Sequence, residues 1–424
     1  MAPGILVDEP TKAPFTPPIS KRNDDAPRHI FPDGIRTSGQ HPPLYDLLKP
    51  YEAFPKEITG PTVWKKEDFV DHPERWIHRF TEEEIDELSE ATDAFIASGT
   101  PLEGISKEFF PLPKLAPTLA ALRDDLLNGK GFILFKGFPV GKWEPLKTAA
   151  AYMGLGTHLG YFVSQNGLGH VLGHVKDVGD NPEQIDSVRI YRTAARQFFH
   201  ADDCDIVGLL CLHRAQEGGE SDIVSVHNVW NILQREHPDV AELLTKPIWY
   251  FDRKGEVSIG QEEYIRQPVV YLEKDGSKGR LYCKWDPYYV RSLWRFWDKG
   301  LLPPLSDEQK RAMQILEDTC QREALHMILE VGDIQFVSNS HLLHARTAYK
   351  GMNTLLLYLI YSPSCQLIHL PTDQTSLPQL RVVICLDCGL PLLKVKVAGL
   401  CPCLIAMRRN AEAFRSTTLR QGPR

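Results

Sequence analysis

The sequence predicts an α+β fold in which a β-barrel or two-layer sheet core is braced by helices. Between about residue 155 and residue 345, short apolar runs typical of strands are broken by glycine, proline and aspartate. Two longer segments with helical periodicity interrupt these runs, and paired strands with helical insertions are typical of sheets covered by helices. No segment reaches the roughly 18 consecutive apolar residues of a membrane span, so we expect no membrane partner.

The two ends of the chain differ in composition from its middle. Residues 1–58 are rich in proline and charge and lack a sustained period, so we expect a largely irregular arm. The main domain is expected over 59–363. The tail, 364–424, holds five of the nine cysteines and is expected to be poorly ordered. It is either a genuine divergent ending or a replaced one, as a frame shift or a misread splice junction would produce.

The first ordered elements of the domain have clear boundaries. A helix is predicted over 81–99, because Thr81 is a good N-cap, Glu84 completes a capping box and Gly99 can end the helix. "APTLAALRDDLLNGKG" predicts a second helix. "GFILFKGFPV" (131–140) then has the length and composition of a buried strand.

Strand-like runs and two helices follow. The helices are predicted in "HNVWNILQREHPDVAELL" and in "SDEQKRAMQILEDTCQREAL", where Ser306 and Gln309 form a second capping box. The strand-like runs are "HLGYFV", "GLGHVLGHV", "FFHADDCDIVGLLCL", "SDIVSV", "RQPVVYLE" and "GRLYCKWD".

Charge and cysteine usage limit the partners and the compartment. A formal net charge of -7 disfavours nucleic acid or an anionic membrane as the main partner. The N-terminal "MAPGILVDEPTKAPF" lacks an apolar segment behind a basic stretch, and the cysteines are irregularly spaced. Reduced thiols in a cytoplasmic protein are therefore expected.

A histidine and an aspartate stand two positions apart in "QFFHADDCDIVGLLCL" (197–212), an otherwise apolar run. Charged groups are costly to bury without compensation, and residues i and i+2 of a strand face the same side. His200 and Asp202 can therefore point into one cavity, with Asp203 and Asp205 facing away into solvent or supporting the site. The alternative interpretation is a buried ion pair that closes the strand.

A third ligand is available far along the chain in "GDIQFVSNSHLLHARTAY". His341 and His344 are three apart, so on an extended segment they face opposite sides and one of them can join the site. Two histidines and one carboxylate on a single face are the ligand set of non-haem Fe(II) oxygenases, which leave adjacent positions for a bidentate 2-oxo acid and O₂.

Residues from about 60 to 350 resemble the taurine dioxygenase/TfdA-like family of Fe(II)/2-oxoglutarate dioxygenases, especially its fungal members. "YRTAARQFFHADDCDIVGLLCLHRAQEGGESDIVS" and "GDIQFVSNSHLLHARTAY" carry the resemblance. The family's "N-x-x-x-x-H-x-R" context matches Asn339, His344 and Arg346, which selects His344 over His341. The resemblance implies a double-stranded β-helix (jelly-roll) core with the metal at one mouth.

The resemblance also assigns roles to individual residues. It implies that His200, Asp202 and His344 hold Fe(II) and form the catalytic centre. It further implies 2-oxoglutarate as co-substrate, O₂ as oxidant, and oxidation of a small-molecule substrate with release of succinate and CO₂. Ser221 in "GGES" corresponds to the residue that contacts 2-oxoglutarate, and Arg346 and Asn166 are further candidates for this contact. The oligomeric state stays open, with a homo-oligomer as one expectation.

One departure from the family concerns the co-substrate. Relatives carry an arginine beyond the distal histidine that pairs with the remote carboxylate of 2-oxoglutarate. Here the strand reads "MNTLLLYLIYSPS", Thr354 stands roughly where the arginine is expected, and no lysine or arginine lies between Lys350 and Arg381. Loss of such a partner costs about 2 to 5 kcal/mol. The alternative hypothesis is therefore a metal-binding jelly-roll protein that is catalytically impaired, and a third is a cupin-like enzyme that uses no oxo acid.

Overall fold

A computed structural model of the protein describes residues 48–163, 171–202, 204–254, 262–272, 280–351 and 354–361. Most of the predicted arm, the candidate Asn166 and the whole predicted tail lie outside the described residues. The domain boundaries predicted from the sequence therefore stay predictions. No described helix has both the length and the apolar composition needed to cross a membrane.

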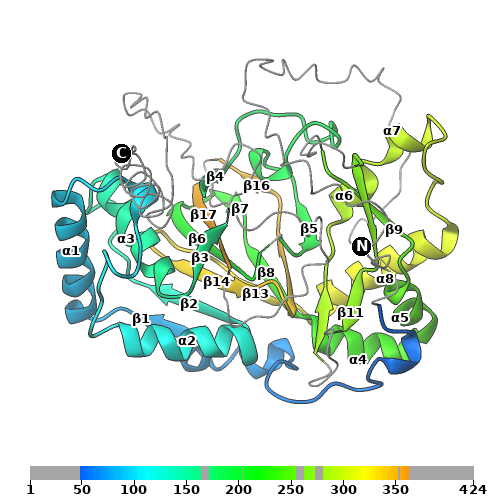
Figure 1. The fold of residues 1–424 in the computed structure, drawn as a ribbon, viewed down its shortest axis with the longest axis horizontal. Coiled ribbons are helices and arrows are strands. Elements are labelled where there is room, and N and C mark those ends of the chain that lie inside the picture. Colours follow the sequence, from blue (N-terminus) through cyan, green and yellow to red (C-terminus); the bar gives the residue numbers. More distant parts are fainter. Residues whose placement is uncertain are drawn as a thin grey trace, which may run out of the picture. The chain divides into compact units, whose positions relative to one another are not determined.

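Two sheets pack face to face and form the core (Figure 1). The seven-stranded sheet, called the large sheet below, has the order β1-β2-β14-β6-β17-β3, and β4 also pairs with β17. The four-stranded small sheet has the order β13-β8-β15-β5. The large sheet consists of β1 (Ile77–Arg79), β2 (Phe132–Lys136), β3 (Tyr161–Val163), β4 (Leu172–Lys176), β6 (Ile206–His213), β14 (Ile334–Ser338) and β17 (Thr354–Tyr361). The small sheet consists of β5 (Gln197–His200), β8 (Ser221–Ser225), β13 (Leu325–Met327) and β15 (Leu342–Arg346).

Apolar side chains fill the space between the sheets. Val207 and Val337 of the large sheet belong to one buried cluster with Ile223 and Leu342 of the small sheet. Burial of apolar surface on both inner faces is what holds two sheets together. This arrangement is the predicted α+β jelly-roll core.

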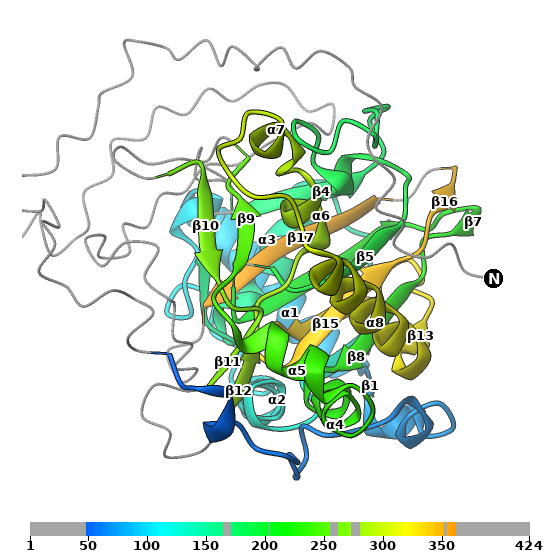
Figure 2. The ribbon, with the colours of Figure 1, turned by 90° about the vertical axis from the view of Figure 1, so that its right-hand side faces the viewer.

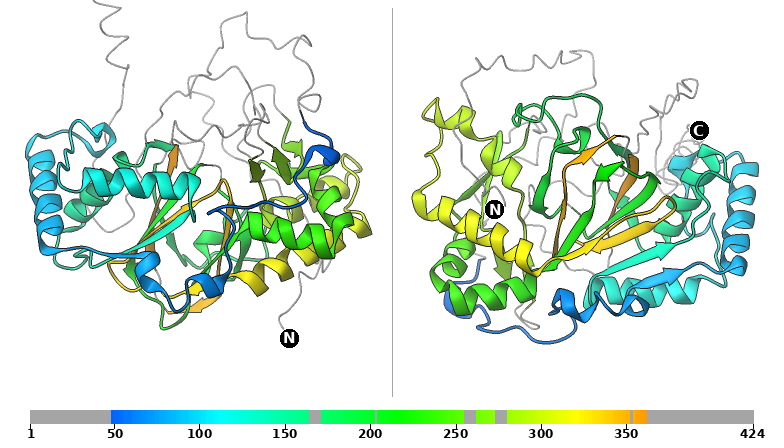
Figure 3. Two further views of the ribbon diagram at one scale, coloured as in Figure 1. Left: turned by 90° about the horizontal axis from the view of Figure 1, so that it is seen from below. Right: turned by 180° about the vertical axis from the view of Figure 1, so that it is seen from behind.

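Separate groups of helices cover the outer faces of the two sheets (Figures 1 and 2). Leu88, Leu119 and Tyr152, from three different helices, pack with Phe336 of the large sheet. Val229 and Leu316 pack with other apolar side chains on the outer face of the small sheet. The first group is α1 (Glu82–Ala97), α2 (Ala116–Asn128) and α3 (Pro145–Thr157), and the second is α4 (Val226–Glu236), α5 (Pro238–Thr245) and α8 (Asp307–Glu323). Figure 3 shows the same two groups from below and from behind.

Short elements connect these layers. The remaining strands are β7 (Glu217–Gly218), β9 (Trp249–Asp252), β10 (Tyr264–Gln267), β11 (Val270–Leu272), β12 (Leu281–Cys283) and β16 (Tyr349–Lys350). The remaining helices are α6 (Pro287–Arg291) and α7 (Trp294–Trp297), with 3₁₀ turns at η2 (Tyr51–Ala53), η3 (Lys66–Asp68), η4 (Pro73–Arg75), η5 (Leu102–Gly104) and η6 (Ile190–Arg192).

The predicted helix starts are confirmed. The Thr81 side chain accepts from the backbone of Glu84, which returns a bond to the Thr81 backbone, and α1 begins there. Ser306 and Gln309 form the same capping box at the start of α8. Helix α3 was not predicted, because its run of small residues carries little amphipathic signal.

Two predicted elements are each divided in the structure. The helix predicted in "HNVWNILQREHPDVAELL" ends at Glu236, and α5 begins at Pro238, because proline lacks the N–H donor that a continuous helix needs. The run "FFHADDCDIVGLLCL" is not one strand. β5 ends at His200 in the small sheet, and β6 begins at Ile206 in the large sheet, so the intervening residues cross between sheets.

The described end of the predicted arm lies against α4. The Trp230 indole donates to the Pro55 carbonyl at 2.8 Å, and the Asn231 side chain bonds both the N–H and the carbonyl of Ile58. Phe54 is buried against Trp230, with ring centroids 5.6 Å apart. The described part of this stretch contains the 3₁₀ turn η2 and is packed onto the domain.

Candidate metal centre

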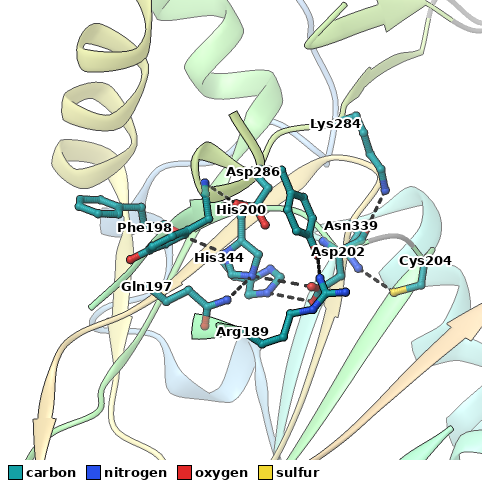
Figure 4. A network of polar contacts seen from close by, with 12 residues as sticks. Arg189, Gln197, Phe198, His200, Asp202, Cys204, Lys284, Asp286, Asn339 and His344 are labelled. Atoms are coloured by element: carbon teal, nitrogen blue, oxygen red, sulfur yellow. Dashed lines mark hydrogen bonds and ion pairs between the residues drawn. The ribbon is translucent and has the colours of Figure 1, made fainter. Parts of the chain in front are cut away.

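The structure brings His200, Asp202 and His344 together at one end of the space between the sheets (Figure 4). His200 is the last residue of β5, and His344 lies opposite it on β15 in the strand register. Asp202 stands two residues beyond β5, in the segment that crosses to β6. One ligand atom from each of the three residues lies within 4.8 Å of the other two.

The donor set fits a first-row metal ion. Nε2 of His344 lies 3.3 Å from one carboxylate oxygen of Asp202, and Nε2 of His200 lies 3.8 Å from the other. Bonds of about 2 Å to nitrogen and oxygen bring neighbouring ligand atoms to about 3 Å from each other, so small adjustments would close the set around an ion. Two imidazoles and one carboxylate are the facial set associated with non-haem Fe(II).

Local contacts set the protonation states of the candidate ligands. Nδ1 of His200 lies 2.9 Å from the Phe198 carbonyl, so Nδ1 carries the proton and Nε2 presents its lone pair to the site. Burial, together with His344, lowers the pKa of His200 and keeps its imidazole neutral. Burial alone would raise the pKa of the Asp202 carboxyl, but the hydrogen bond with His344 and the ammonium group of Lys284 lower it instead. Asp202 is therefore an anion at neutral pH.

Asp202 is positioned by contacts to its backbone. The side-chain oxygen of Asn339 accepts from the Asp202 N–H at 3.2 Å, and Nζ of Lys284 donates to the Asp202 carbonyl at 3.0 Å (Figure 4). Asn339 also donates from its side chain to Cys204 and from its backbone to Asp205. The turn between β14 and β15, which precedes His344, thus holds the segment between β5 and β6.

A cavity of about 70 Å³ adjoins the three residues. Its polar side chains come mainly from the small sheet, and its apolar side chains come mainly from the large sheet. In the strand register, Arg346 pairs with Ser221 on one side and with Gln197 on the other, so these three form a row beside the two histidines. The lining residues are Val175, Tyr191, Gln197, His200, Asp202, Val207, Leu209, Gly219, Ser221, Leu329, His344, Ala345, Arg346, Leu355 and Leu357.

The predicted co-substrate residues have different environments. Ser221 is buried, and its hydroxyl lies 3.0 Å from the amide nitrogen of Gln335 in the large sheet. Arg346 is also buried, and its Nη2 donates to the carbonyls of Thr193 and Ala195 at 2.9 and 2.7 Å. Both line the cavity, whereas Asn166 lies outside the described residues.

Three other residues singled out from the sequence have defined positions in the structure. His341 points away from the cavity and is fully buried, with Nδ1 2.8 Å from the Ser340 hydroxyl and Nε2 3.2 Å from the Gly129 carbonyl. Of the two alternatives for Asp205, exposure to solvent is wrong, since the crossing segment turns it into the interior with no exposed surface, and its carbonyl accepts from the Asn339 N–H. On β17, Leu355 and Leu357 line the cavity and Thr354 does not.

Sequence reasoning did not single out Gln197 or Lys284. The Gln197 amide nitrogen lies 2.9 Å from Nε2 of His200, and it lies three residues ahead of that histidine. The position of Gln197 three residues before a candidate ligand was the only signal in the sequence that could have indicated this contact. Lys284 follows β12, far from Asp202 in sequence, and no local pattern indicated the contact.

The comparison with family models decides the identity of the domain. The model of the taurine catabolism dioxygenase TauD, TfdA family matches residues 98–360. The chain belongs to this family of non-haem Fe(II)/2-oxoglutarate-dependent oxygenases. Two curated relatives of this TauD/TfdA domain are each 28% identical to the chain. FR-33289 synthase of Streptomyces rubellomurinus matches over 70% of this chain and 86% of its own length. Taurine hydroxylase-like protein SAT17 of Stachybotrys chartarum matches over 69% of this chain and 75% of its own length.

Solved structures share the TauD-like fold. An asparagine oxygenase in complex with Fe(II), 3-hydroxyasparagine and succinate superposes with a TM-score of 0.52 at 15% identity, over 68% of this chain and 94% of that one. The oxygenase OrfP with Fe, succinate and 3-hydroxyarginine gives a TM-score of 0.51 at 15% identity over the same shares. At 15% sequence identity, this structural similarity establishes the jelly-roll fold.

Proposed function

We propose that the protein is an Fe(II)- and 2-oxoglutarate-dependent dioxygenase that hydroxylates a small molecule and releases succinate and CO₂. The convergence of His200, Asp202 and His344 beside a cavity, in a chain of this family, carries the proposal. The hydroxylated amino acids and succinate bound in the asparagine oxygenase and OrfP structures support the reaction type.

The three candidate ligands would have different roles in holding the metal ion. His200 and His344 would supply neutral nitrogen ligands, and Asp202 the anionic oxygen ligand. Fe(II) held on one face would offer adjacent positions to the 2-oxo acid and O₂ and supply the oxidation of a C–H bond. The apolar side chains of the large sheet limit water in the cavity, which strengthens the electrostatic contacts there.

The test is formation of the weak visible absorption band that 2-oxoglutarate gives with Fe(II) under anaerobic conditions. We expect the wild-type protein to form it and His200→Ala to lose it. His326→Ala is the matched control, because His326 is exposed on β13 of the same sheet and pairs with Asp222. A folded wild type without the band, or a His200→Ala variant that keeps it, would refute the proposal.

A second candidate function is metal binding with impaired catalysis, favoured by the absence of a lysine or arginine from 354–361. Succinate formation with a panel of small molecules separates the two. Turnover that depends on 2-oxoglutarate dismisses the second candidate, and retained iron binding without any turnover supports it. Oxygen uptake that needs no 2-oxo acid indicates the cupin-like alternative.

A further inference from the structure

Arg346 is a buried cation in the cavity wall, and Asp177 acts on its charge without forming an ion pair with it. Its side chain is only 7% exposed, and among the described residues no carboxylate lies within ion-pair distance of it. Buried arginines are normally paired with an acid, because a lone buried charge is costly. The guanidinium is always protonated in proteins, so its positive charge calls for an anion.

The existing contacts of Arg346 use only part of the guanidinium. Both hydrogen bonds come from Nη2, to the carbonyls of Thr193 and Ala195, and the group also lies over the Tyr349 ring at 4.8 Å. Nη1 and Nε are buried and donate to nothing among the described residues. A purely structural role for Arg346 leaves these donors unexplained, since buried donors are nearly always satisfied.

The position of Arg346 suits the remote end of a bound 2-oxo acid. Arg346 lies two residues beyond His344 on β15, and residues i and i+2 face the same side. A rise of about 3.3 Å per residue places the arginine row about 7 Å from the histidine row. A five-carbon 2-oxo diacid, chelating at one end, can span that separation with its second carboxylate.

Two lysines near the site, Lys350 and Lys284, are already engaged elsewhere. Lys350 is largely exposed and pairs with Glu217 at 2.7 Å. Lys284 donates to the Asp202 carbonyl and does not line the cavity. On the opposite wall, β17 presents Leu355 and Leu357.

We infer that Arg346 binds the remote carboxylate of 2-oxoglutarate and so replaces the arginine missing from β17. The inference rests on the proposed function and deepens it. The co-substrate anchor then sits on the strand that carries a metal ligand, and the leucines of β17 contact the methylene groups of the co-substrate. The site selects 2-oxo diacids over 2-oxo monoacids.

The experiment measures binding instead of turnover. Anaerobic Fe(II) protein is titrated with 2-oxoglutarate and with 2-oxopentanoate, which lacks the second carboxylate, and each Kd is read from the visible band and from calorimetry. We expect the wild type to prefer 2-oxoglutarate by about 30-fold or more, the range for one buried charge pair. Arg346→Met should reduce that preference to near one while Fe(II) binding is retained.

Control variants keep the test decisive. Arg196→Met removes a neighbouring arginine that pairs with Glu317 and does not line the cavity, and it should keep the preference. Arg346→Gln retains a donor for the Thr193 and Ala195 carbonyls and should lose the preference, which decides the question if the methionine variant does not fold. A folded, iron-binding Arg346 variant that still prefers the diacid overturns the inference. A wild type that binds neither 2-oxo acid overturns the proposed function itself.

Discussion

The small sheet and the large sheet face each other across one cavity, yet they contribute side chains of opposite character. The small sheet supplies His200, His344, Ser221 and Arg346 to the lining. The large sheet supplies valine and leucine side chains from β4, β6 and β17. The two candidate histidine ligands and the buried arginine therefore lie on one sheet, while the other sheet lines the cavity with apolar side chains. Low polarity on one side strengthens the electrostatic interactions made on the other.

Asp202 and Asn339 belong to neither sheet, and they connect the two. Asp202 lies in the segment from β5 to β6, and Asn339 in the turn from β14 to β15. Each segment passes from one sheet to the other, and the bond between them holds the segments together. The candidate anionic ligand thus lies where the chain changes sheets, so its position depends on how the sheets pack.

The largest expected effect is the loss of a ligand from the small sheet. His344→Ala should weaken Fe(II) binding by more than about 100-fold, exceeding the 10- to 100-fold cost of losing an outer partner. Anaerobic equilibrium dialysis measures it. His341→Gln is the control three residues away: its side chain is buried outside the cavity, so it should lower the unfolding free energy and leave iron affinity unchanged. The reverse pattern would make His341 the ligand.

A smaller effect is expected from the connection between the sheets. Asn339→Ala leaves the Asp202 N–H without its partner and frees the crossing segment. Iron affinity should fall by about 10- to 100-fold, as for other residues that orient a metal ligand. Asn231→Ala is the matched control, because this buried amide forms hydrogen bonds with the backbone of Ile58 and neither residue lines the cavity. Equal losses of iron affinity in both variants would show that general destabilisation is the cause.

The candidate metal ligands could be predicted from the sequence more closely than the strand ends and cavity-facing residues around them. The His200 and Asp202 pair is a local pattern, and the family context of Asn339 selected the second histidine. The change of sheet after His200 is set by tertiary packing and left no local signal. On β17, the register against β6 shifts between Thr354 and Leu355. Because a slip of one residue exchanges the two faces of a strand, the cavity-facing positions there could not be read from spacing.

The smallest effect on the metal is expected from the apolar wall, and it tests the division between the sheets most directly. Leu355 is 5% exposed and belongs to the cluster between the sheets. Leu355→Ala should lower the free energy of unfolding by about 2 to 5 kcal/mol, as for other buried leucines, measured by urea denaturation. Fe(II) affinity should stay within about threefold of wild type, because each 1.4 kcal/mol corresponds to a tenfold change and Leu355 contributes no ligand. A large loss of iron affinity in a variant of unchanged stability would show that the large sheet takes part in metal binding. The proposed difference in role between the small sheet and the large sheet would then be wrong.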